Sequence, residues 1–168
     1  MRFPASLLLV PSLLCAIPVT HAQDALSLQP TRMLDYQAHE GTWMQPDISP
    51  DGRTILFDLL GDIYALDAAG GTARPVLTGM AFERNPVFSP DGTQFAFISD
   101  RSGVTNLWIA NVDGTGLKQL SQDKSVAIYA SPAWSPDGRF VTVSRTVHSI
   151  LAFELYLYDK DGGSGIQL

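Results

Sequence analysis

Histidine and carboxylate side chains are the residues of this sequence that could ligate a metal ion. A hydrolytic zinc site needs about three such ligands converging on one ion. Beyond residue 22 the histidines are His39 and His148, which stand 109 positions apart and belong to no His-x-His pair. We therefore interpret each as a surface or packing residue, and we predict no metal site in this chain.

Motifs for nucleophilic catalysis and for phosphate binding are also missing from the sequence. No Gly-x-Ser-x-Gly elbow is present. The run Asn111-Val112-Asp113-Gly114 has a weak similarity to a calcium-binding loop but lacks the glutamate that completes one, so a plain turn is favoured. The glycines occupy turn positions and form no phosphate-binding loop. We predict no catalytic residue and no cofactor here.

The residues of the chain are organised by a repeat instead. The tetrad Ser-Pro-Asp-Gly begins at Ser49, Ser89 and Ser135, so the copies are 40 and 46 residues apart. Proline pre-sets φ for a tight turn, aspartate bonds the backbone two residues on, and glycine adopts a positive φ. Serine can accept a hydrogen bond from a backbone N–H. Each tetrad therefore predicts the turn of a β-hairpin.

Short apolar runs surround each tetrad and predict four strands per repeat. After the glycine, aligned residues recur with the strand period of two, as in Phe95 and Phe97. The third strands are apolar on both faces, which is typical of a sheet packed between two others. We predict an all-β chain of three four-stranded β-propeller blades, over 46–79, 86–121 and 132–168. A β-sandwich is the alternative, but it does not require a repeating register.

Three blades are fewer than the four to eight that close a propeller. We therefore expect an incomplete ring, which is the N-terminal part of a longer protein or a truncated product. Within the N-terminal segment 23–45, residues 32–42 are predicted to form an outer strand that closes the ring with a final blade.

Residues 1–22 are predicted to be a secretory signal peptide. Arg2 provides the basic start, an apolar run follows, and Ala22 is a small residue suited to cleavage. The run is too short and too often interrupted by proline to favour a membrane anchor, the rival interpretation. Cys15, the single cysteine, lies in this run, so disulfides are not expected in the mature chain.

The charge of the chain makes nucleic acid an unexpected partner. The net charge is −6, and it becomes −7 without residues 1–22, which carry Arg2 and no acidic residue. Binding to phosphates requires clustered Lys and Arg, and the sequence contains no such cluster. The acidity is most simply a feature that aids solubility.

The repeat resembles the WD40-like repeat of TolB and of the tricorn protease. This resemblance rests on the tetrads, on Ile98 to Gly103 and on Asn106-Leu107-Trp108, and it spans 46–168. A closer resemblance, to the propeller half of secreted bacterial amidohydrolase-family proteins, rests on four segments: 40–44, 59–64, 79–82 and 162–165. It implies a periplasmic hydrolase of amide-like bonds. The hydrolase barrel is not in this sequence, so zinc or another divalent metal is implied only for that downstream domain.

Ligand contacts in a propeller are expected where the loops enter the innermost strands, at the mouth of the channel. Those loops are 40–45, 80–85 and 125–131. Candidate binding residues in them are Trp43, Met44, Phe82, Glu83, Arg84, Asn85 and Tyr129. Packing between blades is the favoured alternative for these side chains. Tyr64, Trp108 and Tyr156 recur at one repeat position and are predicted to be core residues.

Three functions stay open at this point. The chain is foremost a non-catalytic propeller that filters substrate for, or docks, the catalytic domain of a periplasmic amidohydrolase-like protein. The alternatives are a TolB-type protein-interaction scaffold of the cell envelope and the propeller of a prolyl-oligopeptidase-like peptidase. The expected partners are further blades, a C-terminal catalytic domain, and envelope proteins or peptides. The expected location is the periplasm or outside the cell, without a membrane span after signal cleavage.

Overall fold

The computed structural model describes residues 36–146 and 152–168. The chain divides into two units, residues 1–37 and 38–168, and every described strand lies in the second. The predicted signal peptide and residues 32–35 of the predicted ring-closing strand lie outside the described residues. Residues 36–46 form no strand in the structure, so ring closure by the N-terminal segment stays a prediction.

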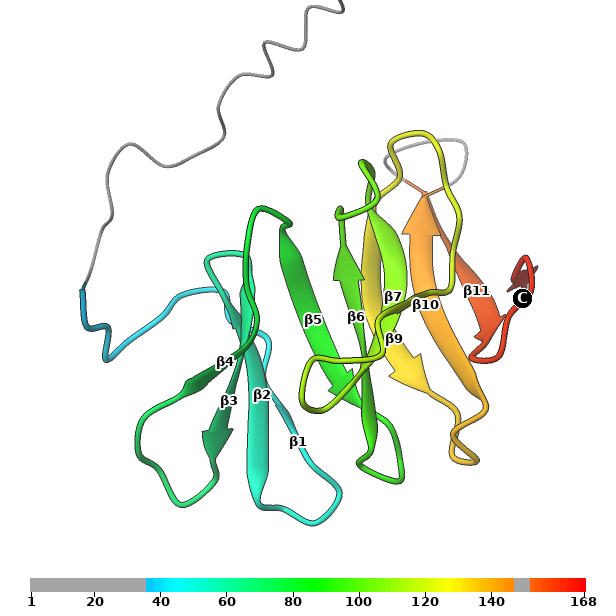
Figure 1. Cartoon of the computed structure of the whole chain (residues 1–168). Helices are drawn as coiled ribbons and strands as arrows, with labels where there is room; N and C mark the ends of the chain where they lie inside the picture. Colours follow the sequence, from blue (N-terminus) through cyan, green and yellow to red (C-terminus); the bar gives the residue numbers. More distant parts are fainter. Residues whose placement is uncertain (1–35, 147–151) are drawn as a thin grey trace, which may run out of the picture. The chain divides into compact units, whose positions relative to one another are not determined.

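Three four-stranded antiparallel sheets make up unit 38–168 (Figure 1). Blade 1 contains β1 (Asp47–Ile48), β2 (Thr54–Leu59), β3 (Asp62–Asp67) and β4 (Arg74–Leu77). Blade 2 contains β5 (Glu83–Phe88), β6 (Gln94–Ser99), β7 (Asn106–Asn111) and β8 (Lys118–Gln119). Blade 3 contains β9 (Tyr129–Trp134), β10 (Phe140–Thr146), β11 (Phe153–Asp159) and β12 (Ile166–Gln167). The prediction of an all-β, incomplete propeller is confirmed.

The tetrads form the turns between the first and second strands of each blade, as predicted. In blade 2, Ser89 Oγ accepts the backbone N–H of Gln94 at 3.0 Å and donates to Asp91 Oδ1 at 2.6 Å. Asp91 Oδ1 also accepts the N–H of Thr93 at 3.0 Å, two residues on. Gly92 has a φ of 71°, a conformation that glycine adopts without steric cost. Blades 1 and 3 repeat the serine–aspartate bond.

The first strands of blades 2 and 3 carry a bulge at the residue before the repeated proline. Asn85 and Ser131 have φ values of 58° and 54°, and the strand register shifts next to each. A proline has no N–H for the ladder, so it is accommodated where the ladder is interrupted. The bulge lets β5 and β9 extend beyond the proline toward their N-terminal ends.

The core lies between the blades, because each blade packs one face against the next. We call the face that packs on the following blade the forward face and the opposite one the backward face. The forward face of blade 1 and the backward face of blade 2 share one cluster, which contains Leu56, Ile63, Ala65, Leu77, Phe88, Phe95, Phe97 and Ala110. The forward face of blade 2 and the backward face of blade 3 share a second, which includes Ala96, Ile98, Leu107, Ile109, Val141, Val143 and Tyr158.

The three aromatic residues predicted to be core differ in their surroundings. Trp108 and Tyr156 are partly buried and pack against the two clusters, as expected. Tyr64 belongs to neither cluster, because it lies on the backward face of blade 1, where no described blade precedes it. It stacks on Phe57 of the same face, with 5.8 Å between ring centroids.

Candidate functional site

The N-terminal ends of β1, β5 and β9 lie at one end of unit 38–168, opposite to the tetrad turns (Figure 1). Strand β1 contacts β5, and β5 contacts β9, as expected of the innermost strands of neighbouring blades. The β2–β3 turn and the connection from β8 to β9 reach the same end. We call it the mouth end.

Three of the predicted binding residues are exposed at the mouth end. Trp43 is 97% exposed and has a φ of 63°, while Met44 and Phe82 are 37% and 56% exposed. A positive φ is costly for a residue with a Cβ and is typical of functional segments. An exposed tryptophan held in this conformation presents a large apolar surface to solvent.

The other four predicted binding residues do not lie in loops. Glu83, Arg84 and Asn85 belong to β5, and Tyr129 begins β9. The loop assignment was wrong because the bulges let both strands start three residues before the repeated proline. Glu83, Asn85 and Tyr129 are 1%, 5% and 0% exposed and Arg84 is half-buried, so the structure uses the three buried residues within and between blades.

Glu83 forms a buried ion pair with Arg101, which follows β6. The guanidinium carbon of Arg101 lies 5.4 Å from the ring centroid of Trp108 and 5.6 Å from that of Phe97, within cation–π range. Burial raises the pKa of the Glu83 carboxyl against the opposing effect of Arg101. Glu83 Oε2 and Trp108 Nε1 are buried and have no hydrogen-bond partner among the described residues. The ion pair of Glu83 and Arg101 is therefore an internal contact that stabilises the start of β5.

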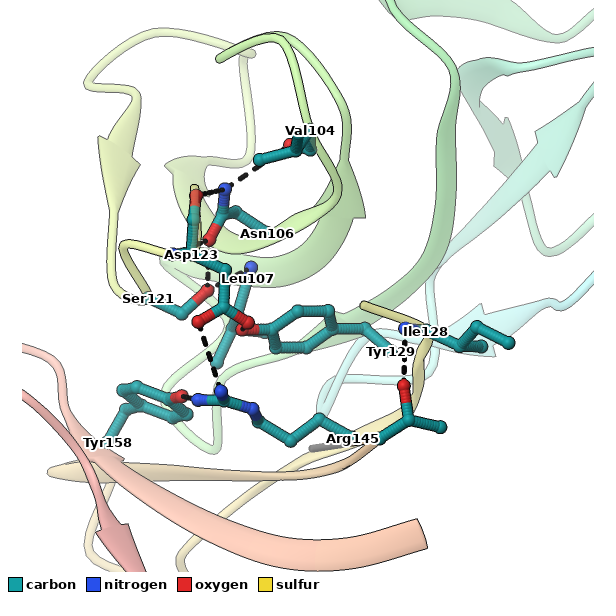
Figure 2. A network of polar contacts seen from close by, with 10 residues as sticks. Val104, Asn106, Leu107, Ser121, Asp123, Ile128, Tyr129, Arg145 and Tyr158 are labelled. Carbon is teal, nitrogen blue, oxygen red and sulfur yellow. Dashed lines mark hydrogen bonds and ion pairs between the residues drawn. The ribbon is translucent and has the colours of Figure 1, made fainter. Parts of the chain in front are cut away.

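A second network joins blade 3 to the segment that leaves blade 2 (Figure 2). The buried Tyr129 hydroxyl donates to Asp123 Oδ2 at 2.7 Å. Arg145 Nη2 pairs with Asp123 Oδ1 at 3.0 Å, and Arg145 Nη1 donates to the Tyr158 hydroxyl at 2.9 Å. Burial raises the pKa of Tyr129, which keeps its hydroxyl protonated as a donor. The backbone N–H of Asp123 is bound by Asn106 Oδ1 at 2.8 Å, so β7 anchors the same segment.

A polar hollow of about 460 Å³ borders this network. Its lining residues are Gln122, Asp123, Arg145, Tyr158, Gly163 and Ser164. The charges of Asp123 and Arg145 are engaged with each other, and the Tyr158 hydroxyl is bound to Arg145. The arrangement stabilises the boundary between two blades rather than presenting an activated nucleophile or base.

Exposed large hydrophobic side chains gather at the mouth end. Of the fourteen that the structure describes, Phe153 begins β11 at this end, and seven others lie on the loops and turns there: Trp43, Met44, Leu60, Met80, Phe82, Val126 and Ile128. We call these seven the mouth group. Leu60 and Gly61 form the tight β2–β3 turn, and a Cβ on Gly61 would lie 2.8 Å from the Phe82 ring. Several large exposed apolar side chains at one end of a domain make that end a candidate interaction site.

Four members of the mouth group were not selected from the sequence. Leu60 has a φ of 56° and is 78% exposed. It was not selected because its neighbours Leu59 and Gly61 give this part of the sequence an ordinary strand and turn pattern. Met80 was within a predicted mouth loop, and Val126 and Ile128 alternate with small residues in another. These four residues could have been identified by one sequence feature, which is a large apolar residue within a segment predicted to be a turn or loop.

The described part of the chain shows neither a group of metal-ligating side chains nor a helix that could cross a membrane. Within residues 36–146 and 152–168, no three His, Cys, Asp or Glu side chains are grouped to hold a metal. His39 is exposed, and His148 lies outside the described residues. Among the same residues, no helix has the length and hydropathy needed to cross a membrane.

The three four-stranded sheets define an incomplete β-propeller. The TolB beta propeller domain family, also called PD40, matches residues 27–168. The chain therefore belongs to this family.

Two curated relatives share part of this sequence. The Tol-Pal system protein TolB of Anaeromyxobacter dehalogenans is 33% identical over 98 residues, which are 54% of this chain and 21% of that protein. The uncharacterized protein Atu1656 of Agrobacterium fabrum is 29% identical over 124 residues, which are 69% of this chain and 42% of that protein. The chain thus spans less than half the length of these relatives.

Solved structures share the fold at lower identity. A TolB candidate from Agrobacterium tumefaciens has a TM-score of 0.65 and 24% identity, covering 76% of this chain and 50% of that one. Porphyromonas gingivalis dipeptidyl peptidase 4 has a TM-score of 0.55 and 18% identity, covering 74% of this chain and 25% of that one. The same blade arrangement thus occurs in a Tol-type protein and in a peptidase.

Proposed function

We propose that this chain is a non-catalytic docking module whose mouth end binds another protein or another domain. The observation that carries the proposal is the mouth group, because its apolar side chains stand on loops and turns rather than in the core. Trp43 and Leu60 are, in addition, held at positive φ, which adds conformational cost to exposed apolar surface.

The chemistry of the partner follows from the composition of the mouth group. Large aromatic and methionine side chains are enriched at the centres of protein interfaces, where they fill apolar pockets. A partner with a matching apolar surface is therefore expected. The similarity to a Tol-Pal system protein supports a partner in the cell envelope, and the predicted signal peptide over 1–22 supports a periplasmic or secreted location.

The two hydrolase interpretations are forms of the same proposal, in which the partner is a catalytic domain of the same polypeptide. The resemblance to amidohydrolase-associated propellers rests on four short segments of the sequence, while a peptidase interpretation is supported by a shared fold with Porphyromonas gingivalis dipeptidyl peptidase 4. In both cases the residues described here would orient or gate a neighbouring site, and any zinc would belong to that domain.

Site-specific photo-crosslinking tests the proposal. A photoreactive phenylalanine analogue is placed at Trp43 or Phe82 of the protein in its native host cells, with Leu117 as the control position, since Leu117 is 42% exposed but lies in the β7–β8 turn. We expect an adduct of defined mass from both mouth positions that Met80→Glu weakens. Adducts from Leu117 alone, or equal adducts from all three positions, would contradict docking at the mouth end.

A further inference from the structure

We propose that the boundary between blades 1 and 2 holds a binding site for a small zwitterion with an apolar body, of the class of apolar dipeptides. The site is a hollow of about 420 Å³ beside the tetrad turns, at the end opposite to the mouth end. This volume lies within the range of about 300–1,000 Å³ that small-molecule sites occupy. The hollow lies between two blades that are both described, so it depends neither on docking at the mouth end nor on what covers the outer faces of the unit.

The hollow is kept open by contacts between the two blades on both of its sides. At the tetrad turns, a Cβ on Gly92 would lie 3.3 Å from Pro50 Cδ, so these two residues are already in contact. At the outer strand, the β7–β8 turn rests on β4, because a Cβ on Gly114 would collide with the carbonyl oxygen of Val76. Pro50 and Gly92 line the hollow beside the first contact, and Val112 lines it beside the second. The blades therefore cannot move together to fill the space without breaking one of these contacts.

The inner wall of the hollow is apolar. Leu56 and Phe88 line it and belong to the core cluster that the two blades share, with exposures of 1% and 7%. Val112 is partly buried and packs against the same cluster. An apolar group that enters the hollow would contact these side chains and leave water, which is favourable.

Two carboxylates line the hollow on the side of the tetrads. Asp51 and Asp91 each use Oδ1 within their own turn, where it accepts the serine hydroxyl at 2.6 Å and the N–H two residues on at 3.0–3.1 Å. The Oδ2 atoms accept no hydrogen bond from another described residue. Hydrogen bonds from the tetrad serines, above all, hold the pKa of both carboxyls below 3.8, so both are ionised at neutral pH. Free carboxylate oxygens next to an apolar wall suit an ammonium group on an apolar body.

One arginine lines the hollow from the outer strand of blade 1. Arg74 begins β4, is exposed, and forms no hydrogen bond or ion pair with another described residue. The pKa of Asp113 is lowered by its bonds to Thr115 and, less, by the charge of Arg74, but the two charged residues are not paired. A carboxylate on the ligand would give the guanidinium a bidentate partner. The ligand that satisfies all three walls therefore carries an ammonium group, an apolar body and a carboxylate.

The boundary between blades 2 and 3 differs in a way that supplies a test. Lys160 occupies the place of Val112, since the N–H of each bonds the carbonyl of the residue that follows the tetrad, Arg139 and Thr93 respectively. A lysine at this position is thus compatible with the fold. Its ammonium group would repel the ammonium group of the ligand.

Titration calorimetry of the full chain with leucylleucine tests the site, and we expect one dipeptide to bind per chain. N-acetyl-leucylleucine lacks the ammonium group, and leucylleucine amide lacks the carboxylate. Each should bind at least about 10-fold more weakly, because each loses a charge-assisted contact. These changes are made in the ligand, so they leave the fold untouched. No binding of leucylleucine, or equal affinity for the three ligands, would overturn the proposal.

Two variants locate the site within the hollow. Val112→Lys should weaken the binding of leucylleucine at least about 10-fold, whereas Val126→Lys, at a position that is 89% exposed at the mouth end, is the matched control and should leave it unchanged. Arg74→Gln should weaken the binding of leucylleucine but not of leucylleucine amide, which has no carboxylate to lose. Thermal unfolding checks that each variant is folded. Unchanged binding to folded Val112→Lys, or equal weakening of both ligands by Arg74→Gln, would overturn the placement of the dipeptide.

Discussion

The carboxylate of Asp58 accepts the backbone N–H of Asn85 at 3.0 Å, across the boundary between blades 1 and 2. Its other oxygen accepts the N–H of Gln45 at 2.7 Å, on the segment that enters blade 1. Asp58 is 8% exposed. The extra residue of a β-bulge is left without a ladder partner, and Asn85 is such a residue. One buried carboxylate therefore satisfies an amide that the fold leaves unpaired, and joins two blades at the mouth end.

Replacement of Asp58 should consequently destabilise the propeller more than the small size of the aspartate side chain suggests. Asp58→Ala removes the acceptor of two amides, and we expect a loss of about 3–4 kcal/mol in the free energy of unfolding, measured by urea denaturation. Asp58→Asn keeps one oxygen acceptor and should lose about half as much. Asp67→Ala, which removes an exposed acceptor for the N–H of Ala69, is the control and should cost under about 1 kcal/mol. Equal losses for the two alanine variants would refute this role for Asp58.

The tetrad aspartates make the stability of the fold depend on pH. The Ser89 hydroxyl and then the N–H of Thr93 hold the pKa of Asp91 below its ordinary value of 3.8. The folded state therefore prefers the ionised carboxylate more than the unfolded chain does. This contribution is fully present above pH 3.8 and is lost as the pH falls through the lower pKa of the folded state. Asp51 and Asp137 are shifted in the same direction by their own serines.

Thermal unfolding as a function of pH tests this effect. Between about pH 4 and pH 2 the melting temperature of the unaltered protein should fall more steeply than that of Asp91→Asn, whose side chain does not titrate. Asp161→Asn, in the β11–β12 turn, is the control and should follow the unaltered protein. Parallel curves for Asp91→Asn and the unaltered protein would show that the turn does not favour the ionised form.

Gly114 in the β7–β8 turn should tolerate no side chain. Its φ is 85°, and a Cβ there would collide with the backbone carbonyl oxygen of Val76 on blade 1. Gly70 has a similar φ of 96° but meets no described atom within 4 Å. Gly70→Ala should therefore cost only the conformational penalty of about 1–2 kcal/mol, and Gly114→Ala should cost at least about 2 kcal/mol more. Similar losses in urea denaturation would show that the turn moves away from blade 1 without cost.

The repeat explains why the fold could be predicted from the sequence. It also explains why the burial of the residues at the mouth end could not. Proline, aspartate and glycine in the tetrad restrict the backbone locally, so the turn around Ser89 follows from residues within six positions of it. Glu83 and Asn85 depend on a bulge that no local signal marks, because a residue before proline is ordinarily extended rather than at positive φ. Their burial is also decided by Arg101 and Asp58, which lie 18 and 27 positions away.

The predicted binding residues divide along the same line. Trp43, Met44 and Phe82 are exposed, and a binding role for them stays a prediction. They could be selected because large apolar residues in an otherwise polar loop are visible in the sequence. Tyr129 has the same composition signal, yet it is fully buried and bonded to Asp123. Whether a side chain is exposed depends on how the blades pack. A sequence pattern can therefore select candidate surface residues, but it cannot distinguish them from similar residues that are buried between blades.

The pair formed by Asp123 and Arg145 should link blade 3 energetically to the segment that leaves blade 2. Both side chains are largely buried, at 19% and 16% exposure, and Arg145 also stacks over Tyr156 with 4.4 Å between its guanidinium carbon and the ring centroid. Removal of one partner leaves the other charge poorly solvated, so a single replacement costs more than the pair contributes.

A double-mutant cycle with Asp123→Ala and Arg145→Ala should give a coupling energy of about 1–3 kcal/mol in urea denaturation. The exposed pair of Arg139 and Asp159 is the matched comparison, and its coupling should stay below about 1 kcal/mol. If the two cycles gave the same coupling, the segment after blade 2 would be held by Tyr129 and Asn106 rather than by the ion pair.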